Sequence, residues 1–442
     1  MKLAFVIQRY GAEVLGGSEQ LCRLVAERLA LQHDVEVLTT CARDYVTWKN
    51  EYPEGSDRVK GVTVRRFASA RMRDIESFNK YSDWIFNNPH TRNDEMEWLK
   101  QQGPWCPSLI DFLRKNHQQY DVLIFFTYLY ATTVLGVEVN PGRSIVVSTA
   151  HDEPAIKLEI FKDVFTKCAA LCYLTNSERE FVQRQFPDRP LLEELVGVGI
   201  DIPHHQPYPR MPERIEEEPV ATTSEAGPAS EEAAAKAPAE SNDTAESDTR
   251  DFPSHLLSRG SVFRRRHRLH GPFALYGGRI DPGKGCEELL QYFSSYVGEG
   301  GEATLALMGA KLMSLPEDPA VRFAGMLSDS ERVQALEAAT VVVCPSPYES
   351  LSLLALEALA VGTPILVNAR SEVLVEHCVR SNGGLWYSNR DEFIECLKLL
   401  VGDARLRAAL GKNGRDYVRQ NYRWDVVLGK YERLFAKVRN AR

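Results

Sequence analysis

Three local structures follow one another in the stretch Val341-Val342-Val343-Cys344-Pro345-Ser346-Pro347-Tyr348-Glu349-Ser350-Leu351-Ser352. It begins as a buried strand, continues as a loop bracketed by two prolines, and ends where an apolar helix is expected to start. Because a serine hydroxyl can accept hydrogen bonds from the first free N–H groups of a helix, we expect Ser350 or Ser352 to cap this helix. Gly362 and Pro364, which follow it, are typical helix-ending signals.

The expected helix over residues 353–361 carries a single charge, Glu357, among leucine, alanine and valine side chains. A helix without a polar face is normally buried, and a buried carboxylate without a partner is costly. We therefore expect Glu357 to have a partner, either another protein group or a bound ligand. Glu357 stands eight residues after Glu349, which ends the proline-bracketed loop.

The chain length of 442 residues exceeds what one ordinary core supports, so two domains are expected. The net charge of −8 comes from one segment. Residues 211–251 hold twelve acidic and three basic residues, whereas the rest of the chain holds forty-nine acidic and fifty basic residues. Because the remainder is nearly neutral, global charge does not indicate a nucleic-acid partner, and we expect none.

Residues 203–258 are rich in proline, glutamate, alanine and serine and poor in large apolar side chains. Such a segment cannot bury enough apolar surface to offset its ordering entropy. We interpret it as a disordered acidic linker between two folded domains. A regulatory element is the alternative, since an arginine-rich stretch begins at Arg259.

Cysteine usage and hydropathy favour a protein of the cytoplasm. The nine cysteines form no C-x-x-C pair and no zinc-like spacing, as is usual in a reducing compartment. The apolar run at residues 3–7 is too short for a signal peptide, and the uncharged run at residues 122–137 is shorter than a membrane span. We expect a cytoplasmic protein or one held peripherally at the inner face of the membrane.

The first half of the chain opens with a strand–loop–helix–strand unit. A buried strand at residues 3–7 is followed by a glycine-rich loop, a helix from about residue 19 to 31, and a strand at residues 35–39. Gly16 and Gly17 stand at the start of the helix, where free N–H groups could face an anion or a sugar hydroxyl. A tight turn that needs glycine for backbone reasons is the alternative.

Two further features of the first half point to a ligand-binding edge. His151 follows a strand at residues 144–149, and ligands bind at the carboxyl ends of the strands in open α/β sheets. A histidine of an ordinary surface loop is the alternative. Residues 70–118 combine arginines with tryptophans, which suits either a partly buried helical cover or a surface that contacts sugars or lipid headgroups.

A second α/β series begins at residues 273–276 and continues as Gly277-Gly278-Arg279-Ile280-Asp281-Pro282-Gly283-Lys284-Gly285. This segment nearly matches the P-loop pattern, but Gly285 has no hydroxyl for Mg²⁺, which argues against a P-loop nucleotidase. Two cations, several glycines and a helix start nevertheless suit a diphosphate. Because no Asp-x-Asp triplet occurs, we expect Arg279 and Lys284 to neutralise a nucleotide diphosphate, with no metal and no cofactor.

Together these motifs resemble the retaining glycosyltransferases of family 4, which have the GT-B fold. The resemblance rests on the segment 277–285, on Glu349 with Glu357, on Gly16-Gly17 and on His151. It implies an α/β protein in which two Rossmann-like, doubly wound parallel-sheet domains face each other across a cleft.

The resemblance also implies a division of the chain. An N-terminal acceptor-side domain would cover residues 1–202, followed by the linker at 203–258. A nucleotide-sugar-binding domain would cover residues 259–423. The C-terminal helix at 424–442 would then cross back to the first domain.

Roles on the donor side follow by position from the same resemblance. Arg279 and Lys284 would hold the donor diphosphate, next to Gly278, and stabilise the charge that develops as it leaves. Glu349 would contact the donor sugar hydroxyls. The backbone of Ser350, Leu351 and Ser352 would lie near the phosphates, and Glu357 would accept hydrogen bonds from the ribose hydroxyls.

In the facing domain, Gly16 and Gly17 would approach the phosphate or the acceptor, and His151 would line the donor-sugar site. We therefore expect Glu349, Lys284, Arg279 and His151 to be the catalytic residues. One departure from the family is Ser350, since many members have glycine directly after the first glutamate.

The function that this resemblance implies is transfer of a sugar from a nucleotide-diphosphate donor to a glycan or lipid-linked acceptor. Transfer would retain the anomeric configuration without a metal and without a protein nucleophile. Peripheral contact of the first domain with a membrane is also expected. The alternatives are another GT-B activity, such as a sugar epimerase or a phosphorylase, and an inactive scaffold that binds sugar nucleotides.

Overall fold

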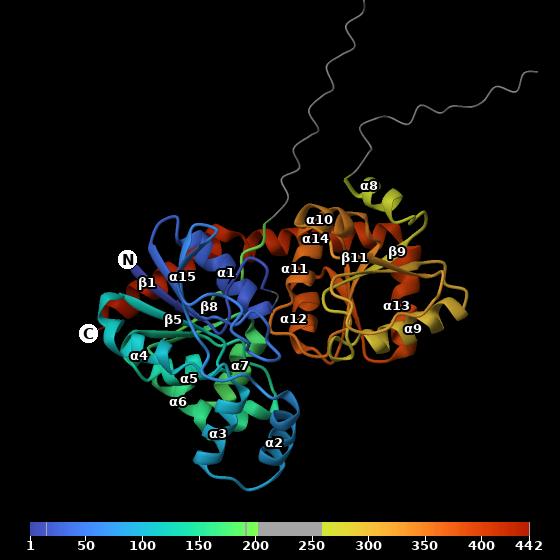
Figure 1. The fold of residues 1–442 in the computed structure, drawn as a ribbon. Helices are drawn as coiled ribbons and strands as arrows, with labels where there is room; N and C mark the ends of the chain where they lie inside the picture. Colours follow the sequence, from blue (N-terminus) through green and yellow to red (C-terminus); the bar gives the residue numbers. More distant parts are fainter. Residues whose placement is uncertain (15, 191, 202–258, 442) are drawn as a thin grey trace, which may run out of the picture.

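The computed structural model describes residues 1–441 except 15, 191 and 202–258, so the expected linker at 203–258 lies outside the described residues. The described chain forms two α/β domains, each built on its own sheet of mostly parallel strands (Figure 1). The first contains residues up to 201, and the second begins at the helix that starts at Arg259. The α/β class with two parallel sheets, expected from the sequence, is confirmed.

The first domain is built on a sheet with the strand order β3-β4-β2-β1-β5-β6-β7-β8, in which β3 alone is antiparallel to its neighbour among the described strands. Both faces of the sheet are covered, so β1 and β5 are apolar almost throughout. The strands are β1 (Lys2–Val6), β2 (Asp34–Thr40), β3 (Gly55–Val59), β4 (Val62–Phe67), β5 (Val122–Phe126), β6 (Ser144–Val147), β7 (Ala170–Tyr173) and β8 (Glu193–Leu195).

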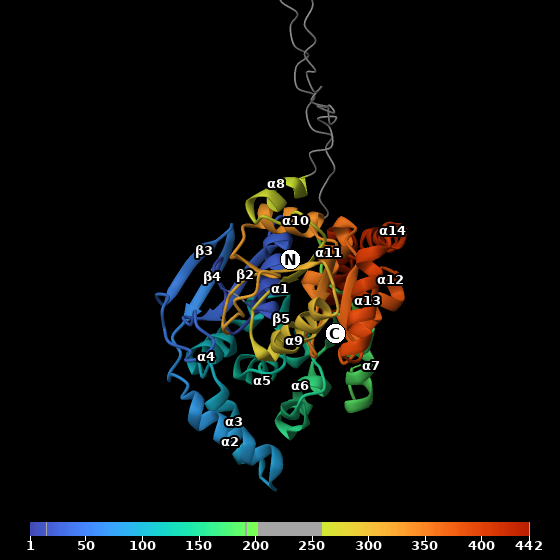
Figure 2. The same ribbon diagram turned by 90° about the vertical axis from the view of Figure 1, so that its right-hand side faces the viewer.

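Helices cover both faces of this sheet. They are α1 (Gly17–Leu29), α2 (Ile75–Asn87), α3 (Arg92–Gln102), α4 (Pro107–Asn116), α5 (Ala131–Val137), α6 (Lys162–Lys167) and α7 (Asn176–Gln185), with short 3-10 turns η1 (His117–Gln119), η2 (Pro141–Arg143), η3 (Pro154–Lys157) and η4 (Glu159–Phe161). Figures 1 and 2 show α2 and α3 at the lower end of the domain. Trp98 of α3 is buried while Trp84 of α2 is 40% exposed, so residues 70–118 are a partly buried helical cover.

The second domain is built on an all-parallel sheet with the order β11-β10-β9-β12-β13-β14 among the described strands. The strands are β9 (Phe273–Gly277), β10 (Thr304–Met308), β11 (Val321–Gly325), β12 (Val341–Cys344), β13 (Ile365–Asn368) and β14 (Gly384–Tyr387). The helices are α8 (Arg259–Arg266), the 3-10 turn η6 (Pro282–Lys284), α9 (Cys286–Gly298), α10 (Asp329–Ala338), α11 (Leu353–Val361), α12 (Glu372–Ser381), α13 (Arg390–Gly402) and α14 (Ala404–Asn421).

The last helix, α15 (Trp424–Asn440), joins the two domains. It runs from the end of the second domain back across the first, where it packs against β5, β8 and η2 (Figure 1). Its buried face carries Val427, Tyr431, Leu434, Phe435 and Val438. These side chains belong to one apolar cluster that also contains residues of β1 and β9, so the core is continuous between the domains.

Two helix starts are capped in different ways. Thr175 is the N-cap of α7, because its extended backbone lets the hydroxyl accept from the Glu178 N–H. Ser352 is the N-cap of α11, but its side chain makes no capping hydrogen bond. The prediction that a serine side chain caps this helix is therefore wrong. Ser352 has a φ of 62°, in the left-handed region, whereas a capping serine normally has an extended backbone.

Candidate active site

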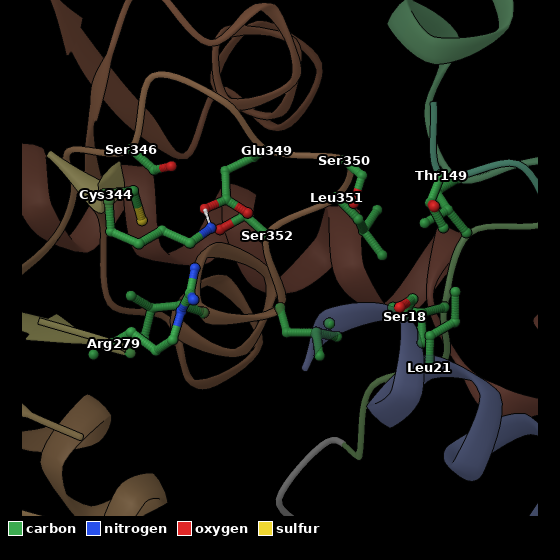
Figure 3. A pocket seen from close by; sticks show the side chains of 18 of the residues that line it. Ser18, Leu21, Thr149, Arg279, Cys344, Ser346, Glu349, Ser350, Leu351 and Ser352 are labelled. Atoms are coloured by element: carbon green, nitrogen blue, oxygen red, sulfur yellow. Dashed lines mark hydrogen bonds and ion pairs between the residues drawn. The ribbon is translucent and has the colours of Figure 1, made fainter. Parts of the chain in front are cut away.

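A cavity of about 240 Å³ lies between the two domains (Figure 3). It opens where the carboxyl ends of the strands of both sheets meet, which is where α/β sheets bind ligands. The first domain lines it with Gly17, Ser18, Leu21, Thr149, Leu174 and Val198. The second domain lines it with Tyr276, Gly277, Gly278, Arg279, Lys284, Cys344, Pro345, Ser346, Glu349, Ser350, Leu351, Ser352, Leu353 and Leu354.

The loop after β9 is shaped by glycines and by one aspartate. Gly278 has a φ of 141° and Gly285 a φ of 74°, values that side chains rarely adopt. A Cβ on Gly285 would lie 2.4 Å from the Pro345 carbonyl oxygen, so only glycine allows this loop to touch the loop after β12. Asp281 accepts a hydrogen bond from the Lys284 backbone N–H at 2.9 Å and thereby fixes the turn that carries Lys284.

Lys284 and Glu349 form an ion pair inside the cavity. The Lys284 Nζ lies 2.8 Å from the Glu349 Oε1, and the two side chains are 29% and 19% exposed (Figure 3). The Arg279 guanidinium lies beside this pair, with its Nε 3.6 Å from the Asp281 carboxylate. The two cations and the carboxylates of Glu349 and Asp281 thus meet in a partly desolvated place, where charge interactions are stronger than in water.

The start of α11 supplies unpaired backbone donors to the same cavity. The first N–H groups of a helix have no partner within the helix, and Leu353 and Leu354, the first two residues of α11, line the cavity. Such a helix start favours an anion. The Cys344 thiol also lines the cavity, but burial raises its pKa well above the ordinary range, so it stays protonated and is no nucleophile.

Glu357 has the partner that its surroundings require. Its Oε1 lies 2.9 Å from the Nη2 of Arg332, which belongs to α10. Burial raises the pKa of Glu357 to about 7, against the opposite effect of Arg332. Glu357 is not among the described residues that line the cavity, although Leu353 and Leu354 of the same helix are.

The two glycines at the start of α1 have different surroundings. A Cβ on Gly16 would lie 2.1 Å from the Glu19 Oε2, so packing requires glycine there. A Cβ on Gly17 would meet nothing within 4 Å, because Gly17 faces the open cavity. Sequence reasoning missed Glu19 itself, a buried carboxylate that pairs with Arg9 at 2.5 Å and accepts from Gln8 at 3.0 Å.

His151 lies at the rim of the site rather than among the cavity-lining residues. Its Nε2 is 3.6 Å from the Glu153 carboxylate, and its ring centroid is 6.4 Å from that of Tyr348 in the second domain. Thr149, two residues earlier, does line the cavity. His151 therefore faces the loop that carries Glu349.

Tyr45 makes a second contact across the cleft that sequence reasoning missed. The Arg279 Nη1 donates to the Tyr45 hydroxyl at 3.4 Å, and the guanidinium lies 5.9 Å from the centre of the ring. The side chain of Tyr45 is 43% exposed. A tyrosine in a loop after a strand carries no pattern in the sequence that would mark it as a cleft residue.

Residues 262–417 match the family model described as "Glycosyl transferases group 1". This segment is a glycosyltransferase group 1 domain. The trehalose synthase of Rubrobacter xylanophilus is 26% identical over 207 residues, which are 43% of this chain and 48% of that protein. A GDP-mannose-dependent alpha-(1-6)-phosphatidylinositol dimannoside mannosyltransferase of Mycobacterium tuberculosis is 32% identical over 123 residues, which are 26% of this chain and 32% of that protein. The matches thus span less than half the length of these relatives.

Among solved structures, HepE from Anabaena in complex with UDP and glucose superposes with a TM-score of 0.64 at 14% identity. The match covers 99% of this chain and 100% of that one. The sequence identity is too low to carry more than the fold, and the fold is GT-B, as expected from the sequence.

The described residues contain neither a membrane-spanning helix nor a cluster of metal-binding side chains. None of the described helices is long and apolar enough to cross a membrane. Within the same part of the chain, no group of three or more histidine, cysteine, aspartate or glutamate side chains is arranged to hold a metal ion.

Proposed function

We propose that this protein is a glycosyltransferase of family 4 that moves a sugar from a nucleotide-diphosphate donor to a hydroxyl acceptor. Transfer retains the anomeric configuration and requires no metal ion. The observation that carries the proposal is the convergence of Lys284, Arg279, Glu349 and the start of α11 in one cavity that Gly17 faces from the other domain.

The donor diphosphate binds between the two cations and the start of α11. Lys284 and Arg279 offset the negative charge that develops on the diphosphate as the glycosidic C–O bond breaks. The unpaired N–H groups of Leu353 and Leu354 offer additional donors to the phosphate oxygens. These groups supply the charge compensation that a divalent cation gives in other transferases, and the sequence has no Asp-x-Asp triplet for such a cation.

Glu349 orients the donor sugar rather than attacking it. Its carboxylate already accepts a hydrogen bond from Lys284 and can accept others from sugar hydroxyls. The acceptor oxygen then forms the new C–O bond on the face that the diphosphate leaves. The departing phosphate oxygen takes the acceptor proton, so no protein nucleophile and no separate base are needed. Glu357 accepts hydrogen bonds from the ribose hydroxyls, and His151 contacts the donor sugar from the facing domain.

The acceptor binds on the side of the first domain and is a glycan or a lipid-linked glycan. Met72, Ile75 and Trp84, which lie at or near α2, are 65%, 38% and 40% exposed. Exposed apolar and aromatic side chains among arginines suit the surface of a membrane. The name of the mycobacterial relative contains a phosphatidylinositol dimannoside, which supports a lipid-linked substrate for this protein as well.

The experiment that tests the proposal is an NMR assay with UDP-, GDP- and ADP-sugars in the presence of a chelator. We expect release of the nucleotide diphosphate from one donor class, with the transferred or hydrolysed sugar appearing first in the anomeric configuration of the donor. Appearance of the inverted anomer would overturn retention, and loss of turnover on chelation would overturn metal independence. Epimerised donor without nucleotide release, or sugar phosphate formed only with added phosphate, would instead assign an epimerase or a phosphorylase.

A further inference from the structure

Helix α12 (Glu372–Ser381) carries two neighbouring side chains that reach different parts of the molecule. The Glu376 carboxylate bonds to the first domain, whereas the His377 ring bonds to the loop that carries Glu349. Neither residue has a role in the proposed chemistry. Both hydrogen bonds are made by the same turn of one helix, so the two contacts are mechanically linked.

The His377 ring holds the backbone of the loop after β12. Its Nε2 lies 2.7 Å from the Leu351 carbonyl oxygen, and the side chain is 1% exposed. A carbonyl oxygen can only accept, so the proton of this hydrogen bond is on Nε2. Burial lowers the pKa of His377, so the ring is neutral and its Nδ1 accepts from the Tyr417 hydroxyl at 3.2 Å.

The hydrogen-bond chain continues to the crossing between the domains. The Tyr417 hydroxyl lies 3.1 Å from the Tyr422 hydroxyl, and both side chains are buried. The Tyr422 carbonyl in turn accepts from the Ile200 backbone N–H at 2.7 Å, in the last described segment of the first domain. Hydrogen bonds therefore connect the Leu351 carbonyl with the Tyr422 hydroxyl, and the Tyr422 residue itself links that hydroxyl to the backbone just before α15.

Glu376 connects the same helix with the opposite wall of the cleft. Its carboxylate accepts from the Ser177 N–H at 2.9 Å and from the Ser177 hydroxyl at 2.7 Å, at the start of α7. The next residue, Glu178, accepts from the Ala150 N–H at 2.8 Å. Ala150 stands between Thr149, which lines the cavity, and His151. The first turn of α7 is thus bonded both to α12 and to the loop that carries His151.

We propose that His377 is a positioning residue that fixes the direction of the Leu351–Ser352 peptide, so that the start of α11 and the Glu349 carboxylate are held toward the donor. This role rests on the proposed function, and His377 would support that function through the loop that carries Glu349, without touching the substrate. Glu376 bonds α12 to the first domain, and Tyr417 bonds it to the segment just before α15. The position of the loop that carries Glu349 therefore depends on the relative position of the two domains.

The test compares the variants His377→Leu, His377→Gln and Tyr417→Phe in the full chain. A glutamine amide offers a donor NH2 group and an acceptor oxygen, the two functions that the neutral imidazole also supplies, whereas leucine supplies neither. The matched control is Tyr296→Phe, which removes a buried tyrosine hydroxyl of the same domain that accepts from the Ala303 N–H at 3.4 Å. The readouts are donor turnover, the affinity for the nucleoside diphosphate, and the unfolding temperature of each variant.

We expect His377→Leu to lower turnover at least tenfold and His377→Gln to stay within about threefold of the unchanged protein, since misplaced reacting groups are costly even at small displacements. Tyr417→Phe keeps the Nε2 donor and avoids a large change of shape, so it remains informative if the leucine variant does not fold. We expect it to lower turnover about threefold to tenfold, with Tyr296→Phe unchanged.

Two results would overturn the positioning role. One is turnover of Tyr417→Phe equal to that of Tyr296→Phe, and the other is a glutamine variant as impaired as the leucine variant at equal unfolding temperature. Failure of the proposed function can be distinguished from failure of the positioning role. If the proposed function is wrong, the unchanged protein itself turns over no nucleotide sugar. The affinity of the variants for the nucleoside diphosphate would then still report on the loop that carries Glu349.

Discussion

Replacing Lys284 with methionine removes one cation from the cavity and keeps the length of the side chain. Lys284 is bonded to Glu349 at 2.8 Å and stands in a turn that Asp281 fixes and that contacts the loop after β12 at Gly285. The substitution therefore changes the charge that the donor diphosphate meets while leaving the surrounding backbone in place. The variant is expected to fold, since methionine keeps the length of the lysine side chain, which is 29% exposed.

The size of the effect follows from the position of the charge. Two unit charges 4 Å apart at an effective dielectric constant of 20 interact by about 4 kcal/mol, and removal of one preorganised group from a transition-state site costs about 2.7–4 kcal/mol. Because Lys284 is partly exposed, water compensates some of the loss, and we take the lower end of this range. We therefore expect donor turnover to fall about a hundredfold in Lys284→Met.

The assay is the initial rate of nucleotide diphosphate release at saturating donor, measured beside the unfolding temperature. The matched control is Lys398→Met, since Lys398 pairs with Glu299 and Glu395 on the surface of the same domain, away from the cavity. The control is expected to keep full activity. Equal turnover in Lys284→Met and Lys398→Met, with both proteins folded, would refute the assignment of Lys284 to the leaving group.

Three further predictions concern stability and packing. Burial raises the pKa of Glu357 from 4.5 to about 7, so the folded protein holds this proton and loses stability as the pH rises through that window. Glutamine does not titrate, so the stability of Glu357→Gln should not show this loss. As the pH rises from 5 to 8, its free energy of unfolding in urea should gain up to about 3 kcal/mol relative to that of the unchanged protein; a constant difference between the two proteins would contradict the raised pKa. Gly285→Ala should weaken nucleotide affinity at least tenfold in calorimetry, because its Cβ would meet the Pro345 carbonyl at 2.4 Å and its φ is positive; unchanged affinity would show that the two loops need not touch. Phe435→Ala on α15 should cost about 3–5 kcal/mol in urea unfolding, since the ring is fully buried; a loss below 1 kcal/mol would show that α15 contributes little to the core.

The proximity of Lys284 and Glu349 could be predicted from the sequence, because the two residues follow neighbouring parallel strands. β9 and β12 pair directly, and their carboxyl ends meet at one edge of the sheet. Such a juxtaposition depends only on strand order and on the local pattern of each loop. The same holds for the apolar helix after Glu349 and for the glycine-rich turn at Gly285.

Contacts between helices could not be read in the same way. Apolar surroundings predict that Glu357 needs a partner, but only the packing of α10 against α11 selects Arg332. The positive φ of Ser352, which removes the expected serine cap, arises from the way the loop enters α11 and leaves no residue signal, since glycine is the usual marker of that conformation.

Contacts across the cleft were the least accessible to sequence reasoning. The bonds of Tyr45 to Arg279 and of Glu376 to Ser177 depend on how two separately folded domains are seated. That seating is set by a large apolar interface around α15, in which many side chains contribute and none is distinctive. The side chains that make contacts across the cleft can therefore be identified only in the folded structure.

The most direct measurement of the central claim is a thermal-shift titration with UDP, GDP, ADP and their sugar conjugates, run in parallel on the unchanged protein and on Lys284→Met. A ligand at a hundred times its Kd stabilises by about 2.7 kcal/mol, which corresponds to several degrees in Tm for domains of this size. The account predicts such a shift with one nucleotide class and its loss in Lys284→Met. No shift with any of these ligands, or an equal shift in both proteins, would contradict a nucleotide-sugar site at Lys284, Arg279 and Glu349.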